Sequence, residues 1–130
     1  MSSSPCPFTL LVVDDHAGLR QTVVTLVATE FPHWRLLEAG CAEDALTLCD
    51  TEQPDLIVLD IKLPGMDGFE ATRRIKEAWP QTLVVMHSSN DMPVYRDASL
   101  AAGAVAFVGK GRNSRSLVPL LASLLAARDA

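Results

Sequence analysis

Short, uninterrupted apolar runs alternate with amphipathic segments along the whole chain. The run Phe8–Val13 is too short for a helix and is rich in valine and leucine, and similar runs recur at Leu56–Leu59, Leu83–Met86 and Ala104–Val108. Such runs are typical of strands that are covered by helices on both faces. A less apolar strand is expected at Arg35–Ala39. The alternation predicts an α/β fold, in which helices cover both faces of a doubly wound parallel sheet.

The intervals between these strands have the spacing of helices. A first helix is expected over Ala17–Glu30, because Leu19 and Val23 lie on one apolar stripe while Arg20 lies off it. The remaining helices are expected after Gly40, over Phe69–Trp79, between a capping Asp91 and a terminating Gly103, and over Ser116–Ala127.

The length of 130 residues and the mass of 14.0 kDa fit one domain. We expect this domain over residues 8–127, preceded by a flexible segment at 1–7 and followed by a tail at 128–130. The apolar runs are too short to cross a membrane, and the first residues have no basic region of a signal peptide. A cytoplasmic location with no membrane partner is therefore expected.

The charge of the chain narrows the kinds of partner. A net charge of −5 and a pI near 5.0 argue against direct binding of nucleic acid, which normally requires a basic face. Cys6, Cys41 and Cys49 have no metal-ligand spacing, and we interpret them as free thiols in a reducing compartment.

Polar residues stand where the predicted strands end. Parallel strands place these positions in one crevice at the carboxyl edge of the sheet, where open α/β sheets bind their ligands. Three carboxylates, a hydroxyl and an ammonium group in one crevice indicate a site for a divalent cation and a phosphoryl group. The residues are Asp14, Asp15, Asp60, Ser88 and Lys110.

Each of these residues also has a simpler interpretation. Asp14 and Asp15 can cap the helix that follows, Lys110 can be a surface lysine, and Ser88 can be a loop hydroxyl. A second buried strand ends in Asp60, however, and clustered carboxylates repel one another unless a cation neutralises them. Magnesium is the ion that such oxygen ligands suit beside a phosphoryl group. His16 has no partner at ligand spacing and is expected at the surface.

The segment Leu56–Gly68, with the sequence LIVLDIKLPGMDG, closely resembles the phosphoacceptor region of the receiver domain of bacterial two-component response regulators. The resemblance extends from about Thr9 to Leu125, and the acidic pair, acceptor segment, hydroxyl and lysine occur in the family's order. It implies a flavodoxin-like sheet with strand order 2-1-3-4-5 and five helices.

The resemblance also implies a role for each site residue. Asp60 corresponds to the phosphorylated aspartate, and Asp15 and Asp60 to direct ligands of Mg²⁺. Asp14 would help position the ion, and the backbone carbonyl of Lys62 would be a further ligand. The transfer is chemically reasonable, because an aligned carboxylate can accept a phosphoryl group when a metal and a lysine share its charge.

The remaining roles belong to the switch. Ser88 would move to hydrogen-bond the phosphoryl group that Lys110 also binds, and Phe107 would rearrange with it, although a phenylalanine in an apolar strand can equally be a core residue. The partner that supplies the phosphoryl group would be a histidine kinase or a phosphotransfer protein. The function is then signalling, and the domain catalyses only its own phosphorylation and dephosphorylation.

Several positions depart from the family pattern. Gly111 follows Lys110 where the family usually has a proline in a cis peptide, so we expect a trans bond or a rearranged loop. Lys62 is an unusual cation beside the acceptor that can alter the lifetime of the phosphorylated state, and Asn90 is expected to face the same region. We interpret His87, at a usually apolar position, as a satisfied core or edge histidine.

The last helix has a wider apolar arc than one core-facing stripe requires. We expect part of it to form a dimer interface or to contact an output domain, with Val94 and Tyr95 extending that face. No DNA-binding helix pair follows, so the chain is expected to act through protein contacts or to be part of a longer regulator. The apolar positions are Leu117, Val118, Leu120, Leu121, Leu124 and Leu125.

Two alternative functions remain, a pseudo-receiver and an aspartate-based phosphatase, and a nicotinamide enzyme is disfavoured. A pseudo-receiver that binds partners without phosphorylation has the same fold, and the altered Lys110–Gly111 loop favours it. An aspartate-based phosphatase normally has a second acid two residues after its nucleophile, where this chain has Lys62. A nicotinamide enzyme needs a glycine-rich turn after the first strand, where this chain has Asp14 and Asp15.

Overall fold

The computed structural model describes residues 8–90, 92–110 and 116–129, and in these residues strands and helices alternate as predicted. The strands are β1 (Thr9–Val13), β2 (Arg35–Ala39), β3 (Leu56–Leu59), β4 (Leu83–Ser88) and β5 (Ala106–Gly109). The helices are α1 (Ala17–Glu30), α2 (Ala42–Glu52), α3 (Gly68–Ala78), α4 (Pro93–Ala102) and α5 (Leu117–Asp129).

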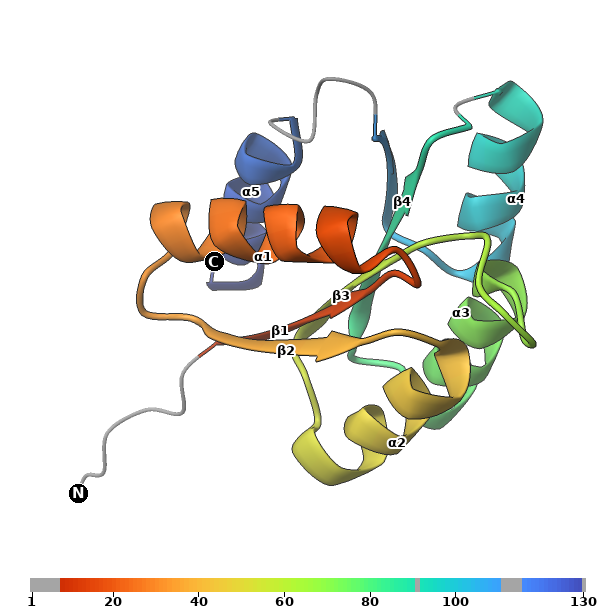
Figure 1. Ribbon diagram of the computed structural model, residues 1–130, viewed down its shortest axis with the longest axis horizontal. Coiled ribbons are helices and arrows are strands. Elements are labelled where there is room, and N and C mark those ends of the chain that lie inside the picture. The colour runs from red at the N-terminus through yellow and green to blue at the C-terminus, as the bar shows by residue number, and fades with distance from the viewer. Residues whose placement is uncertain (1–7, 91, 111–115, 130) are drawn as a thin grey trace.

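The five strands form one parallel sheet in the order β2-β1-β3-β4-β5 (Figure 1). The strand order reverses between β1 and β3, because β2 lies on one side of β1 and the later strands lie on the other. Such a reversal leaves a crevice at the carboxyl edge of the two strands. The flavodoxin-like strand order predicted from the sequence is confirmed.

The helices cover both faces of the sheet (Figure 1), and alternate residues of each strand supply the two cores. In β1, Leu11 and Val13 pack in the core beneath α2 and α3, while Leu10 and Val12 pack beneath α1 and α5. All four side chains are at most 1% exposed, which explains why these four positions of the strand are apolar.

Small differences from the expected bounds have identifiable causes. Strand β4 runs on to Ser88 because Ser88 pairs with Gly109 of β5. Helix α4 begins at Pro93, with Met92 at its N-cap, whereas the expected cap Asp91 lies outside the described residues. The same helix ends at Gly103, whose φ of 114° is readily adopted only by glycine. Helix α5 continues to Asp129, two residues beyond its expected end.

Helix α5 uses more of its apolar surface inside the molecule than the sequence suggested. Leu117 and Leu121 are fully buried, and Leu120 and Leu124 pack against the same core. The sheet face and α1 together cover a wide arc of α5, since α1 and α5 lie side by side (Figure 1). Among the described residues, the exposed large apolar side chains after α1 are instead Met92, Val94, Leu100 and Val105.

Aromatic side chains gather near the amino ends of the strands. Trp34 precedes β2 and stacks on Phe31 with ring centroids 3.9 Å apart, and Phe8 lies 4.5 Å from Trp34. Trp79, at the end of α3, is also on this side of the sheet, because it precedes β4. This edge is opposite the one where the predicted site residues lie.

Two further observations concern the sequence-based expectations. Within the described ranges, no helix is long and apolar enough to cross a membrane. Cys41 and Cys49 are free thiols, and burial raises the pKa of Cys49 to about 11. Cys6 and the rest of residues 1–7 lie outside the described residues, and so does Gly111 with the rest of the loop 111–115 that follows Lys110.

Candidate functional site

Backbone hydrogen bonds continue the sheet ladder one residue beyond three of its strands. The amide of Asp14 donates to Ala39 O at 3.1 Å, and the amide of Asp60 donates to Val13 O at 3.0 Å. The amide of Lys110 likewise donates to Ser88 O at 2.7 Å. These bonds hold the site residues in line with the carboxyl edge of the sheet, where the sequence pattern placed them.

The three carboxylates of this edge converge. Asp14, Asp15 and Asp60 each offer one oxygen, and these oxygens all lie within 4.8 Å of one another. Asp14 and Asp60 are buried, whereas Asp15 is exposed. Magnesium is usually held by a few carboxylate oxygens together with water or phosphate oxygens. The donor set therefore fits a Mg²⁺ ion.

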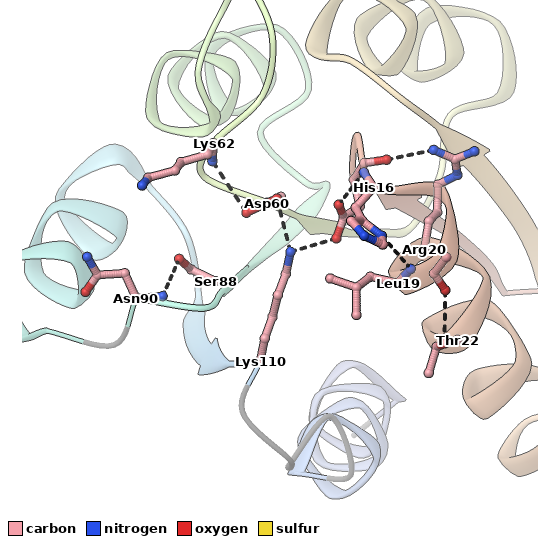
Figure 2. A network of polar contacts seen from close by, with 11 residues as sticks. His16, Leu19, Arg20, Thr22, Asp60, Lys62, Ser88, Asn90 and Lys110 are labelled. Carbon is pink, nitrogen blue, oxygen red and sulfur yellow. Dashed lines mark hydrogen bonds and ion pairs between the residues drawn. The ribbon is translucent and has the colours of Figure 1, made fainter.

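Lys110 lies between two of these carboxylates, as Figure 2 shows for Asp60. Its Nζ is 2.8 Å from Asp14 Oδ2 and 3.1 Å from Asp60 Oδ2. Burial lowers the pKa of Lys110, but the hydrogen bonds and charges of Asp14 and Asp60 outweigh burial and raise it. The lysine is therefore a permanent cation of the site, as its proposed role requires.

For the pKa of Asp60, burial outweighs the effect of the neighbouring opposite charge. Burial raises its pKa, the charge and hydrogen bond of Lys110 oppose that rise, and the negative charge of Asp14 adds to it. The net direction is upward, so one lysine does not fully compensate the two buried carboxylates. A second cation would lower the cost of ionised Asp60, which is further reason to expect metal binding here.

The turn between β1 and α1 is held by His16, a contribution that the sequence did not reveal. His16 caps α1, because its Nδ1 accepts a hydrogen bond from the amide of Leu19 at 3.1 Å. Its own amide donates to Asp14 Oδ1 at 2.9 Å. Neither Asp14 nor Asp15 caps the helix, so the capping interpretation of the acidic pair is wrong. His16 is exposed, as expected.

Ser88 and Asn90 form the opposite wall of the site (Figure 2). Ser88 is 4% exposed, and its Oγ accepts a hydrogen bond from the amide of Asn90 at 3.1 Å. The amide of Lys62 donates to Asp60 Oδ1 at 3.4 Å, while the Lys62 side chain is exposed. The loop after β3 thus contacts Asp60 through its backbone.

Phe107 lies in β5 with 8% of its surface exposed. The guanidinium carbon of Arg96, on α4, is 5.1 Å from the centre of its ring, a cation–π distance. On the same helix, Tyr95 packs against Phe69 of α3, with ring centroids 6.2 Å apart. Tyr95 is half-buried, so the exposed face of α4 is formed by Val94 and its neighbours more than by Tyr95.

His87 is a core residue, but it is not satisfied. It is 3% exposed, and its Nε2 has no hydrogen-bond partner among the described residues. Burial lowers its pKa to about 4, and the nearby charge of Lys110 acts in the same direction. The expectation of a satisfied histidine is therefore wrong: the neutral ring occupies an apolar position of β4 at the expense of one unpaired nitrogen.

Comparisons with known proteins agree with this arrangement. The family model described as the response regulator receiver domain matches residues 10–122. The response regulator GacA of Pseudomonas aeruginosa is 29% identical over 119 residues, covering 92% of this chain and 56% of GacA. The response regulator UvrY of Escherichia coli is 30% identical over 122 residues, covering 88% of this chain and 53% of UvrY.

Solved structures give the same result. A response regulator receiver domain protein from Methanospirillum hungatei superposes with a TM-score of 0.86 at 26% identity, covering 95% of this chain and 98% of that one. The chain belongs to the response regulator receiver domain family. It spans about half the length of the curated relatives GacA and UvrY.

Proposed function

We propose that this receiver domain accepts a phosphoryl group on Asp60 in the presence of Mg²⁺ and thereby switches a protein-interaction surface. The observation that carries the proposal is the convergence of three carboxylate oxygens within 4.8 Å, next to the Nζ of Lys110. Accepting phosphoryl groups is the general role of the family to which the chain belongs.

Asp60 is the nucleophile in this proposal. One of its carboxylate oxygens attacks the phosphorus of a phosphohistidine, so that an O–P bond forms as the N–P bond to the donor breaks. Lys110 balances negative charge on the transferred group, and Asp14 holds Lys110 in place. Bound Mg²⁺ would supply further charge neutralisation and alignment. Its ligands would be Asp15, Asp60 and the backbone carbonyl of Lys62, with Asp14 helping to position it.

The switch follows from the phosphoryl group's need for hydrogen-bond donors. Ser88 Oγ now accepts a bond from Asn90, and its hydroxyl is free to turn toward a new anion on Asp60. Movement of Ser88 would open space at β5, and Phe107 would rearrange together with α4. The exposed apolar residues of α4, together with part of α5, would form the surface that binds a different partner after phosphorylation.

The partners in this scheme are a histidine kinase or phosphotransfer protein that donates the group, and a second copy or an output domain that reads the change. The domain acts as a signalling phosphoacceptor within residues 8–127. Sedimentation velocity with and without phosphorylation tests the dimer. A monomer in both states would exclude self-association as the output.

The second candidate is a pseudo-receiver, which uses the same fold for binding without phosphorylation. The replacement of the usual proline by Gly111 favours it, because that position follows directly on Lys110. The intact set of carboxylates, hydroxyl and lysine favours a working phosphoacceptor more strongly.

Incubation with acetyl phosphate and Mg²⁺, followed by intact-mass measurement under conditions that preserve acyl phosphates, separates these candidates. The wild type is expected to gain one phosphoryl adduct, and a chelator is expected to abolish it. Asp60→Asn should gain none, whereas Asp50→Asn, at an exposed position on α2, should behave as the wild type. A folded wild type that gains no adduct would support the pseudo-receiver.

A further inference from the structure

Asp14 is the most completely restrained residue of the site. Its amide is bound to Ala39 O, its Oδ1 accepts from the His16 amide, and its Oδ2 accepts from Lys110. The remaining polar group is its backbone carbonyl oxygen, which accepts a hydrogen bond of 2.7 Å from Nη1 of Arg20. The bond is charge-assisted, which makes it shorter and stronger than an ordinary backbone contact.

Asp15 is restrained quite differently. Of the residues that the structure describes, none donates a hydrogen bond to its carboxylate, and the side chain is exposed. Its direction therefore depends on the backbone that carries it. The peptide plane that leads into Asp15 contains the carbonyl oxygen of Asp14, and this oxygen is the atom that Arg20 holds.

Arg20 is itself held at one further point, because its Nε donates to Glu38 Oε1 of β2 at 3.0 Å. A Cβ atom at Gly40 would lie 3.5 Å from Arg20 Nη1, so the guanidinium group is close to the residue that follows β2. The Arg20 side chain is 23% exposed, so its guanidinium group is partly shielded from water. Figure 2 shows it extending from α1 toward the turn that carries His16.

We propose that Arg20 is a positioning residue for the metal site: by holding the carbonyl oxygen of Asp14 against the end of β2, it aims Asp15 toward the ion that Asp14 and Asp60 also face. The inference rests on the proposed function, because it concerns the same Mg²⁺ site. Arg20 has no contact with the ion or the phosphoryl group in this role, and it acts through the backbone between Asp14 and Asp15.

Electrostatics and positioning predict effects of opposite sign, which makes the proposal testable. Removing a positive charge near a cation site should strengthen Mg²⁺ binding if charge alone matters. Losing the restraint on the Asp14 carbonyl should weaken it, because Asp15 then samples directions that do not face the ion. Only a role in positioning gives weaker binding after loss of a cation.

The experiment is titration calorimetry of the unphosphorylated protein with Mg²⁺, together with urea unfolding in the absence of the ion. Arg20→Met is expected to weaken Mg²⁺ binding about tenfold. Arg20→Lys keeps the charge but cannot bind Glu38 and the Asp14 carbonyl together, and it is expected to recover only part of that loss. Unfolding in urea reports whether each variant is folded.

Arg35→Met is the matched control. Arg35 makes an ion pair with Glu52 and contacts none of the three aspartates of the site, so its loss should leave Mg²⁺ binding unchanged. If Arg20→Met is folded and binds Mg²⁺ as well as the wild type or better, the positioning role is wrong while the proposed function stands. If the wild type binds no Mg²⁺ and gains no adduct, both proposals fail.

Discussion

The Nζ atom of Lys110 lies 3.1 Å from Oδ2 of Asp60, although 50 positions separate the two residues in the sequence. Strand β4 lies between β3 and β5 in the sheet, so the lysine reaches across one strand to contact the Asp60 carboxylate. The same ammonium group is bound to Asp14. The ammonium group therefore binds carboxylate oxygens that could also be ligands of a metal ion.

Replacing this lysine should separate metal binding from phosphorylation. Lys110→Met removes one positive charge beside the carboxylates, and we expect Mg²⁺ to bind roughly tenfold more tightly. Phosphorylation by acetyl phosphate should nevertheless become slower, because the transferred group loses a cation. Calorimetry and intact mass measure the two effects. Lys62→Met, at an exposed side chain, should change Mg²⁺ affinity less; equal changes in the two variants would contradict the special place of Lys110.

Asp60 should make the metal-free protein less stable as the pH rises. Its pKa is raised by burial and by Asp14, so its contribution to stability is fully present below the ordinary value of 3.8 and is lost as the pH rises through the raised value. Asp60→Asn should therefore have a larger free energy of unfolding than the wild type at pH 7, and the difference should shrink in acid. Urea unfolding without Mg²⁺ at several pH values measures this. A variant that is less stable than the wild type at pH 7 would refute the argument.

His87 should have the opposite pH dependence. Its pKa falls from 6.5 to about 4 on burial, so its contribution to stability is present above 6.5 and is lost as the pH falls toward 4. A shift of this size corresponds to roughly 3 kcal/mol. His87→Val should remove this loss and should also stabilise the protein at pH 7, by about 1 kcal/mol, because no buried nitrogen is left unpaired.

The measurement for His87 is again urea unfolding, now between pH 7 and pH 4. His33→Gln is the control. Because His33 is exposed, this variant should have the same pH dependence of stability as the wild type. Parallel profiles for His87→Val and the wild type would mean that His87 is charged or paired in the folded protein.

The contact between Arg96 and Phe107 should be measurable as a coupling energy. A guanidinium group over an aromatic ring near the surface is worth about 0.5–1 kcal/mol. We therefore expect a double-mutant cycle with Arg96→Met and Phe107→Leu to give a coupling of this size in urea unfolding. The pair Arg73→Met and Phe107→Leu should be additive, because Arg73 on α3 pairs with Glu70 instead. Additivity in both cycles would exclude a restraint on Phe107 by Arg96.

The sheet and the site could be predicted from the sequence for the same physical reason. Strands covered on both faces are largely apolar, so the first charged residue after an apolar run marks its carboxyl end. Asp14, Asp60 and Lys110 all stand at such positions, and parallel pairing brings them together. Their individual chemical roles remain predictions.

What the sequence did not reveal depends on contacts between distant residues. Arg20 lies off the apolar stripe of α1 and has the pattern of a solvated surface residue, since its partners Glu38 and Asp14 belong to other elements. Packing alone also determines that Nε2 of His87 has no hydrogen-bond partner within the part of the chain that the structure describes. The extent to which the leucines of α5 are buried was also not evident from the sequence, because α1 covers a second side of that helix, which no periodicity within α5 can indicate.

The aromatic cluster near the amino ends of the strands determines what tryptophan fluorescence can report. Trp34, stacked on Phe31, and Trp79, at the end of α3, are both on the side of the sheet opposite the carboxylates. Their emission should follow unfolding closely and change little when an ion or a phosphoryl group binds. The protein thus carries an intrinsic fluorophore for its folding, whereas its signalling state must be observed by other means.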